Sequence, residues 1–251
     1  MALGPNTDAR MRPYAQAGAY AADYDAGLRA YMLRVYNYMA SGLLLTGIVA
    51  YFTASTPEIM QMFYTATARG QLQPTMLAYV VMFAPLAFIL VLSFGINKLS
   101  ATTVQALFWV FAVVMGLSSA HIFLTFTGGS VARVFFISAA TFGAMSLYGY
   151  TTKRDLSKFG SFLIMGLIGI MIASIVNIFV GSTALQFVIS VIGVLVFVGL
   201  AAHDTQQIKL IYDEADHADT ATKKAVMGAL SLYLDFLNLF MLLLQLFGDR
   251  R

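Results

Sequence analysis

Two aspartates lie in the most apolar stretches of this sequence, where a charged side chain is costly. Asp235 is the only charged side chain between Ala225 and Gly248, and Asp204 stands near the end of the preceding apolar stretch. An ionised carboxylate inside a bilayer costs about 3 kcal/mol or more, so we expect the chain to use both acids. If the two carboxyls come within hydrogen-bonding reach, they cannot easily both ionise, and the pair would share one proton.

Such a pair would act as a proton-controlled latch. One proton closes it through a carboxyl–carboxylate hydrogen bond, and full deprotonation drives the two segments apart. The open state would leave two negative charges facing a path for cations, and hard cations such as Ca²⁺ prefer oxygen ligands. We therefore predict that Asp204 and Asp235 form the gate and contact Ca²⁺ transiently, without a resident cofactor.

The composition places these acids in a membrane protein. The chain has 251 residues, of which 59% are hydrophobic and only 11% are charged, and its mean hydropathy is +0.77. A soluble domain has about a quarter of its residues charged. The net charge of +3 fits the Lys and Arg of cytoplasmic loops better than nucleic-acid binding. The absence of Cys excludes disulfides and thiol chemistry.

Seven segments are long and apolar enough to span a bilayer, which takes about 20 residues. We expect an all-α fold with spans at residues 33–53, 75–97, 103–125, 131–151, 160–180, 185–207 and 226–247. The charge-free run of residues 159–202 is too long for one helix and is divided at Gly181-Ser182-Thr183, a turn signal.

The distribution of Lys and Arg predicts a cytoplasmic N-terminus. Of the 15 Lys and Arg, eleven fall on the side of the N-terminus and four on the other, namely Arg69, Arg133, Arg250 and Arg251. Seven spans place the C-terminus outside, which Arg250 and Arg251 fit poorly, and an incompletely crossing seventh helix would resolve the conflict. We expect a mobile cytoplasmic tail over residues 1–27, a transmembrane domain over 28–248 and a C-terminal tail over 249–251.

Helical spacing assigns a polar face to the seventh span and a matching face to the sixth. In the seventh span this face holds Gly228, Ser231, Asp235, Asn238, Leu242 and Gln245. In the sixth it holds Gly193, Phe197, Leu200, Asp204 and Gln207. Polar groups avoid lipid, so the seventh helix should turn this face into the bundle and lie at its centre. The two acids reach one depth only if the helices extend beyond the hydrocarbon, because Asp235 lies about 14 Å into its span.

Three segments resemble the Bax inhibitor family in its bacterial form. They are Ser146-Leu147-Tyr148-Gly149-Tyr150-Thr151-Thr152-Lys153-Arg154-Asp155-Leu156-Ser157, Ala202-His203-Asp204-Thr205-Gln206 and Ser231-Leu232-Tyr233-Leu234-Asp235-Phe236-Leu237-Asn238-Leu239-Phe240. The resemblance implies six helices around a seventh and a pH-sensitive calcium leak with an aspartate pair as the proton sensor. It also implies a bacterial inner membrane and a link to a membrane-anchored AAA protease.

Five residues are candidate partners of the sensor. His203, Gln207, Ser231 and Asn238 are its candidate neighbours. His203 stands where the family more often has Tyr. It either tunes the titration, since imidazole titrates near neutral pH, or only caps the helix end or faces headgroups. The second span has no Arg or Glu, so Lys98 at its cytoplasmic end is the candidate cation.

Three functions stay open on these residues. The first, which we predict, is a passive Ca²⁺ conduit that has the bilayer, Ca²⁺ and protons as partners and is not an enzyme. The second is an intramembrane aspartyl protease, although Tyr233-Leu234 precede Asp235 instead of the Gly-x-Gly of such enzymes. The third is a non-conducting regulator that binds another membrane protein.

Overall fold

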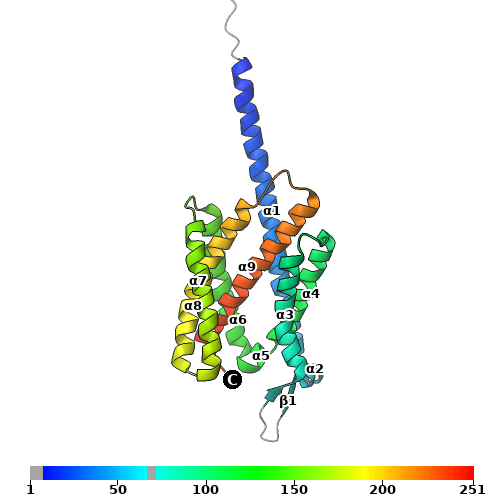
Figure 1. The fold of residues 1–251 in the computed structure, drawn as a ribbon, viewed down its shortest axis with the longest axis vertical. Helices are drawn as coiled ribbons and strands as arrows, with labels where there is room; N and C mark the ends of the chain where they lie inside the picture. The colour runs from blue at the N-terminus through cyan, green and yellow to red at the C-terminus, as the bar shows by residue number, and fades with distance from the viewer. Residues whose placement is uncertain (1–7, 67–71) are drawn as a thin grey trace, which may run out of the picture.

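Seven helices of the chain are long and apolar enough to cross a membrane (Figure 1). The computed structural model describes the backbone of residues 8–66 and 72–251 and the side chains of residues 24–65 and 73–251. The seven helices are α1 (Asp8–Ser55), α3 (Met76–Gly95), α4 (Ala101–Ser119), α6 (Gly128–Thr151), α7 (Ser157–Val180), α8 (Thr183–Leu210) and α9 (Ala218–Phe247). The predicted all-α class and seven spans are confirmed.

The remaining elements lie at one end of the bundle. They are the helices α2 (Pro57–Phe63) and α5 (Ile122–Thr125) and the antiparallel strands β1 (Tyr64–Ala66) and β2 (Leu72–Pro74), in which Thr65 pairs with Gln73. We call this the outer end, and the end where α1 enters the bundle the inner end, after the predicted orientation. That orientation stays a prediction, and Arg69 lies outside the described residues.

The last helix is the centre of the bundle. α9 packs against α1, α4, α6 and α8, while α3 packs mainly on α4 and α7 mainly on α8. In its apolar window 61% of the residues are buried, against 39% or less in every other span. The predicted central seventh helix is confirmed, with α3 and α7 as outer members that reach it through their neighbours.

α9 is longer than the predicted span and runs obliquely across the bundle (Figure 1). It begins at Ala218 and has 30 residues, which is about 45 Å of helix for about 30 Å of hydrocarbon. A helix longer than the membrane is thick accommodates the difference by tilting. The extra inner turns and the tilt together bring Asp235 to the level of Asp204.

The start of α1 at Asp8 and the C-terminus lie at opposite ends of the molecule (Figure 1). α9 runs through to the outer end, where Arg250 pairs with Phe126 in an antiparallel bridge and Arg133 forms an ion pair with Asp249 of 2.9 Å. An incompletely crossing seventh helix is therefore not needed. At the other end, part of the predicted tail lies outside the described residues, and the chain is helical from Asp8 onward. The mobility of this tail stays a prediction.

Candidate functional site

Asp235 is a buried acid at mid-helix in α9. Only 6% of its surface is exposed, and the carboxyl of Asp204 on α8 approaches it closely enough for a side-chain hydrogen bond. A bond between two carboxyls needs a proton on one of them, because ionised carboxylates only accept. Asp235 Oδ2 has no hydrogen-bond partner among the described residues. The structure thus brings together the two acids that the spacing placed on facing helices.

Asp204 is held by its neighbour in sequence. His203 Nδ1 lies 2.8 Å from Asp204 Oδ1, and the two side chains are 14% and 27% exposed. The imidazole packs over α7 at Gly160, where an added Cβ would lie 2.5 Å from Nε2. His203 therefore faces Asp204 and α7 inside the bundle, and not the lipid headgroups. Whether it tunes the titration stays a prediction.

The opposite face of α9 is anchored to α1 and α4. Tyr233 precedes Asp235 by two residues, and its hydroxyl lies 2.7 Å from Thr46 Oγ1, which donates to Ala112 O at 2.8 Å. The Tyr233 ring is fully buried and makes an edge contact with Phe111 at 5.3 Å between ring centres. Two residues turn a helix by about 200°. Tyr233 therefore fixes α9 to one side while Asp235 faces α8 on the other.

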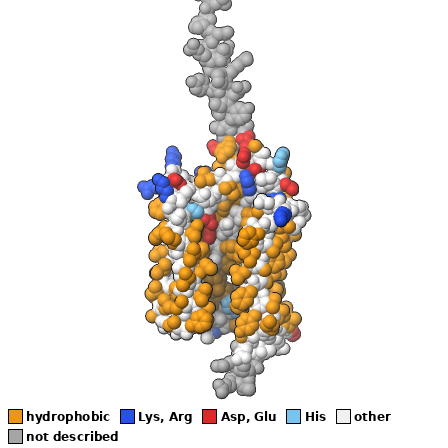
Figure 2. All heavy atoms as spheres, in the orientation of Figure 1, with side chains coloured by type: hydrophobic (Ala, Val, Ile, Leu, Met, Phe, Trp, Pro, Cys, Tyr) orange, Lys and Arg blue, Asp and Glu red, His pale blue; other side chains and the backbone are white. Residues whose placement is uncertain are grey.

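The polar face of α9 forms a continuous seam with α8. From the inner end outward, Gly228 lies against Ile208, Asp235 against Asp204, and Leu242 against Gly193. At the outer end Gln245 Oε1 accepts bonds from Gln186 at 2.5 Å and Ser190 at 3.1 Å. Figure 2 shows acidic side chains in a hollow between two groups of helices, where α9 crosses the bundle in Figure 1. Outward from the acids, the seam is thus apolar at Leu242 and polar again at Gln245.

The segment that carries the first motif packs around the inner end of α8. Ser146 Oγ lies 3.0 Å from Thr205 Oγ1, and an added Cβ on Gly149 would lie 2.1 Å from Ala202 O, so the backbones of α6 and α8 touch there. Gln206 donates to Arg154 O and accepts from Leu156 N, both at 2.8 Å. The motifs from residues 146–157 and 202–206 are therefore one contact that holds Asp204 in place.

The other predicted neighbours take separate positions. Gln207 donates to Ser157 Oγ at 2.8 Å, and the exposed Asn238 donates to Leu234 O of its own helix at 2.8 Å. Ser231 makes no side-chain hydrogen bond with a described residue. Lys98 lies exposed after α3 and forms no ion pair with Asp204 or Asp235. Of these five candidates, His203 is the one with a hydrogen bond to the acid pair among the residues whose side chains are described.

The acid pair offers two carboxylates and the neighbouring imidazole of His203 as side-chain ligands. Among the described residues no group of three or more His, Asp or Glu side chains could hold a metal ion. Stable calcium sites have six to eight oxygen ligands.

Sequence reasoning missed the residues that position the acids rather than form the pair. Thr205, Ser146 and Thr46 are buried and hydrogen-bonded between helices, and the buried Gln206 is hydrogen-bonded to the loop between α6 and α7. Buried polar groups need partners, so a polar side chain within an apolar span is a signal that could have indicated them. The hydrogen-bond partner of each side chain depends on which helices are in contact, and the spacing of residues within one helix does not reveal those contacts.

The fold and this site define a seven-helix integral membrane protein with a pair of acids between its last two helices. The sequence profile described as "Inhibitor of apoptosis-promoting Bax1" matches residues 28–251. The chain is 46% identical to the inner membrane protein YbhL of Escherichia coli over 228 residues, or 90% of this chain and 94% of that one. An uncharacterized protein of Rickettsia prowazekii is 47% identical over 91% of this chain and 93% of its own length. This chain belongs to the Bax inhibitor family.

Proposed function

We propose that this protein is a proton-gated cation conduit in a bacterial inner membrane, with Ca²⁺ as the permeant ion. The observation that supports it is the buried Asp235, whose carboxyl meets that of Asp204. The location is supported by the Escherichia coli relative, which is named as an inner membrane protein. The charge distribution supports a cytoplasmic inner end.

The physical basis is the poor solvation of the acid pair. Two carboxylates at hydrogen-bonding distance in a low-dielectric site cannot both ionise without strong repulsion. One shared proton turns this repulsion into a hydrogen bond that holds α8 against α9. Among the residues whose side chains are described, no Lys or Arg forms an ion pair with either acid, and the nearby Lys209 and Lys224 bond Tyr150 O and Asp216. Loss of the proton therefore separates the two helices at this level.

Separation of α8 from α9 would open the polar seam between them. Carboxylates at Asp204 and Asp235 would then line the path, and the amides of Gln186 and Gln245 would line its outer entrance. Leu242 against Gly193 is the apolar closure between these two regions. Acidic side chains and amide oxygens are suitable ligands for a passing hard cation.

The direct test is Ca²⁺ flux into liposomes that contain the purified protein, measured from acid to neutral pH. We expect the wild type to conduct more as the pH rises, because the pair loses its proton. Asp235→Asn cannot ionise at this position, so its flux should lose the pH dependence. Glu214→Gln is the matched control, since Glu214 is exposed in the α8–α9 connection.

Two results would contradict the proposal. If Asp235→Asn keeps the flux and pH profile of the wild type, the acid pair is not the gate. If wild-type flux equals that of empty liposomes, the chain conducts nothing, and the regulator of a membrane protease becomes the better account. A protease is less well supported, because neither aspartate lines either of the two large apolar cavities between α1 and α6.

A further inference from the structure

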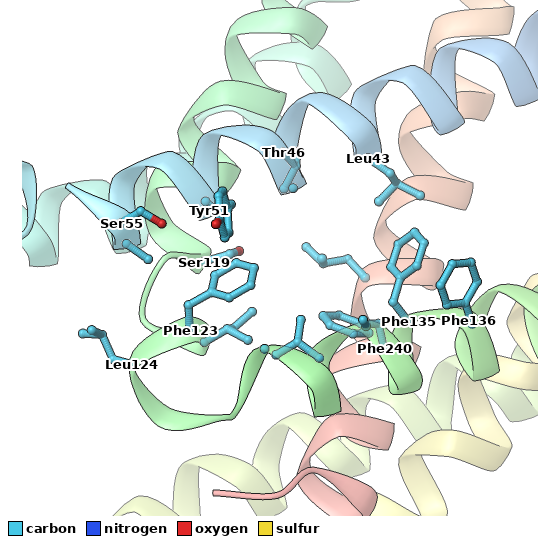
Figure 3. Close-up of a pocket in the computed structure, with 18 of the residues that line it drawn as sticks. Leu43, Thr46, Tyr51, Ser55, Ser119, Phe123, Leu124, Phe135, Phe136 and Phe240 are labelled. Carbon is cyan, nitrogen blue, oxygen red and sulfur yellow. The ribbon is translucent and has the colours of Figure 1, made fainter. Parts of the chain in front are cut away.

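Two neighbouring cavities lie in the space between α1 and α6. The outer cavity, of about 720 Å³, is enclosed by α1, α5, α6 and α9 (Figure 3). The inner cavity, of about 550 Å³, lies closer to the inner end, and Phe236 lines both. The Phe236 ring contacts Phe135 at 5.5 Å and Phe142 at 5.6 Å, so aromatic rings separate the two spaces. Both volumes lie within the range of about 300–1,000 Å³ that is common for ligand sites.

The inner cavity is apolar in its depth and cationic at its mouth. Its walls are formed mainly by Met32, Leu33, Met39, Ala139, Phe142 and Leu147. Arg29 lines the opening from α1 and is exposed. Tyr150 lines the opening from α6, and Lys209 Nζ lies 5.2 Å from the centre of its ring. Arg29 is thus the cation that lines this cavity, while Lys209 lies on α8 behind Tyr150 and is not part of its lining.

The mouth lies near the level at which headgroups are expected. Arg29 is about four residues before the predicted first span, or about 6 Å along the helix. Tyr36 and Tyr150 also line the cavity, and tyrosines are enriched at this interface of a bilayer. Arg29 has no ion-pair partner among the residues whose side chains are described. Its charge is therefore available to an anion from the membrane.

We propose that the inner cavity binds an anionic phospholipid. One acyl chain occupies the space between α1 and α6 against Phe236, and the phosphate lies against Arg29 at the opening. A basic residue near an anionic membrane surface contributes about 1 kcal/mol of attraction, which corresponds to about a fivefold change in affinity. Lipid binding at this site needs both the charge at the opening and the empty space behind it. One mutation can remove the charge, and a different mutation can fill the space.

The test is native mass spectrometry of the delipidated full chain with added phosphatidylglycerol or phosphatidylcholine. We expect the wild type to prefer phosphatidylglycerol. Arg29→Gln should reduce this preference about fivefold. Arg34→Gln is its matched control, because Arg34 is also exposed on α1 but does not line the inner cavity. An equal loss in both variants would show general surface attraction and overturn the site.

Gly143→Leu tests the space itself. Gly143 lines the inner cavity, and an added Cβ meets no atom within 4 Å, so a larger side chain fills the cavity without disturbing the fold. We expect this variant to lose the bound phosphatidylglycerol. Gly47→Leu is the control, since Gly47 has the same open surroundings but lines the outer cavity. Retention of the lipid in Gly143→Leu, or the same loss in Gly47→Leu, would overturn the assignment to the inner cavity.

Discussion

At the scale of single residues, His203 is the side chain that touches the acid pair without belonging to it. Its Nδ1 lies 2.8 Å from Asp204 Oδ1. With the ring proton on Nδ1, the imidazole donates to Asp204, and a donated hydrogen bond favours the ionised form of its acceptor. In the proposed mechanism His203 therefore makes it easier for the pair to lose its last proton.

Replacement of His203 should move the pH dependence of flux. His203→Phe keeps a ring of similar size and removes the donor, so the pair keeps its proton to higher pH and the midpoint of the flux–pH curve should rise. The midpoint is measured in the liposome assay, with the wild type and His203→Phe compared over the same pH range.

His121→Phe is the control for this change. His121 lies between α4 and α5 and is exposed, and among the described residues its imidazole bonds only the backbone oxygen of Ser118. Its replacement should leave the midpoint in place. An unchanged midpoint in His203→Phe, or a shift to lower pH, would contradict the role given to His203.

The sequence predicted which acids face each other but not how they are held. The helical period determines which side chains share a face, so the spacing alone places Asp204 and Asp235 on facing stripes. The contact of His203 depends on side-chain torsions, and the bonds of Gln206 to Arg154 and Leu156 depend on the path of a loop. Neither is contained in the spacing of residues along one helix.

At the scale of elements, the contact between α6 and α8 determines where Asp204 lies. Gly149 touches the backbone of Ala202, two residues before Asp204. Small residues allow helices in a membrane to approach closely. A side chain at this point would push α8 away from α6.

Gly149→Ala should therefore destabilise the protein. The added Cβ would lie 2.1 Å from Ala202 O, which is backbone and cannot move without the helix. Overpacking of this kind costs about 1–3 kcal/mol, measured as the free energy of unfolding in mixed detergent micelles. Gly143→Ala on the same helix is the control, because its Cβ meets open space. Equal stability of the two variants would contradict a close α6–α8 contact.

The spans were predictable to within a few residues except where a helix leaves the membrane. α9 begins eight residues before the predicted start at 226. The prediction started late because Asp219, Lys223 and Lys224 are polar, although they belong to the helix. Hydropathy reports the part of a helix in lipid, not the whole helix. The β1–β2 hairpin was missed because strands of three residues are too short for a recognisable alternation.

At the scale of the whole molecule, α9 packs on α8 through its polar face and on α1, α4 and α6 through the rest of its surface. Tyr233 fixes α9 to α1 and α4 through Thr46, and Phe236 packs on α6. α7 packs mainly on α8. In the proposed mechanism the α8–α9 seam therefore opens at the acids while α9 keeps its contacts with α1 and α4.

A covalent link across the seam should stop this movement. The chain contains no Cys, so Gly193→Cys with Leu242→Cys introduces the only two thiols, at positions that touch in the closed seam. The oxidised protein should show no Ca²⁺ flux at any pH, and reduction should restore it. Each single variant, treated in the same way, is the control. Full flux through the oxidised double variant would show that the path lies elsewhere.

The shared proton itself is the central claim, and infrared spectroscopy detects it directly. A protonated carboxyl has a carbonyl band that an ionised carboxylate lacks. The account predicts one such band in the wild type, lost over the same pH interval in which Ca²⁺ flux rises and missing from Asp235→Asn at the pH where the wild type shows it. A band that persists while flux rises, or two ionised carboxylates throughout the closed state, would contradict the account.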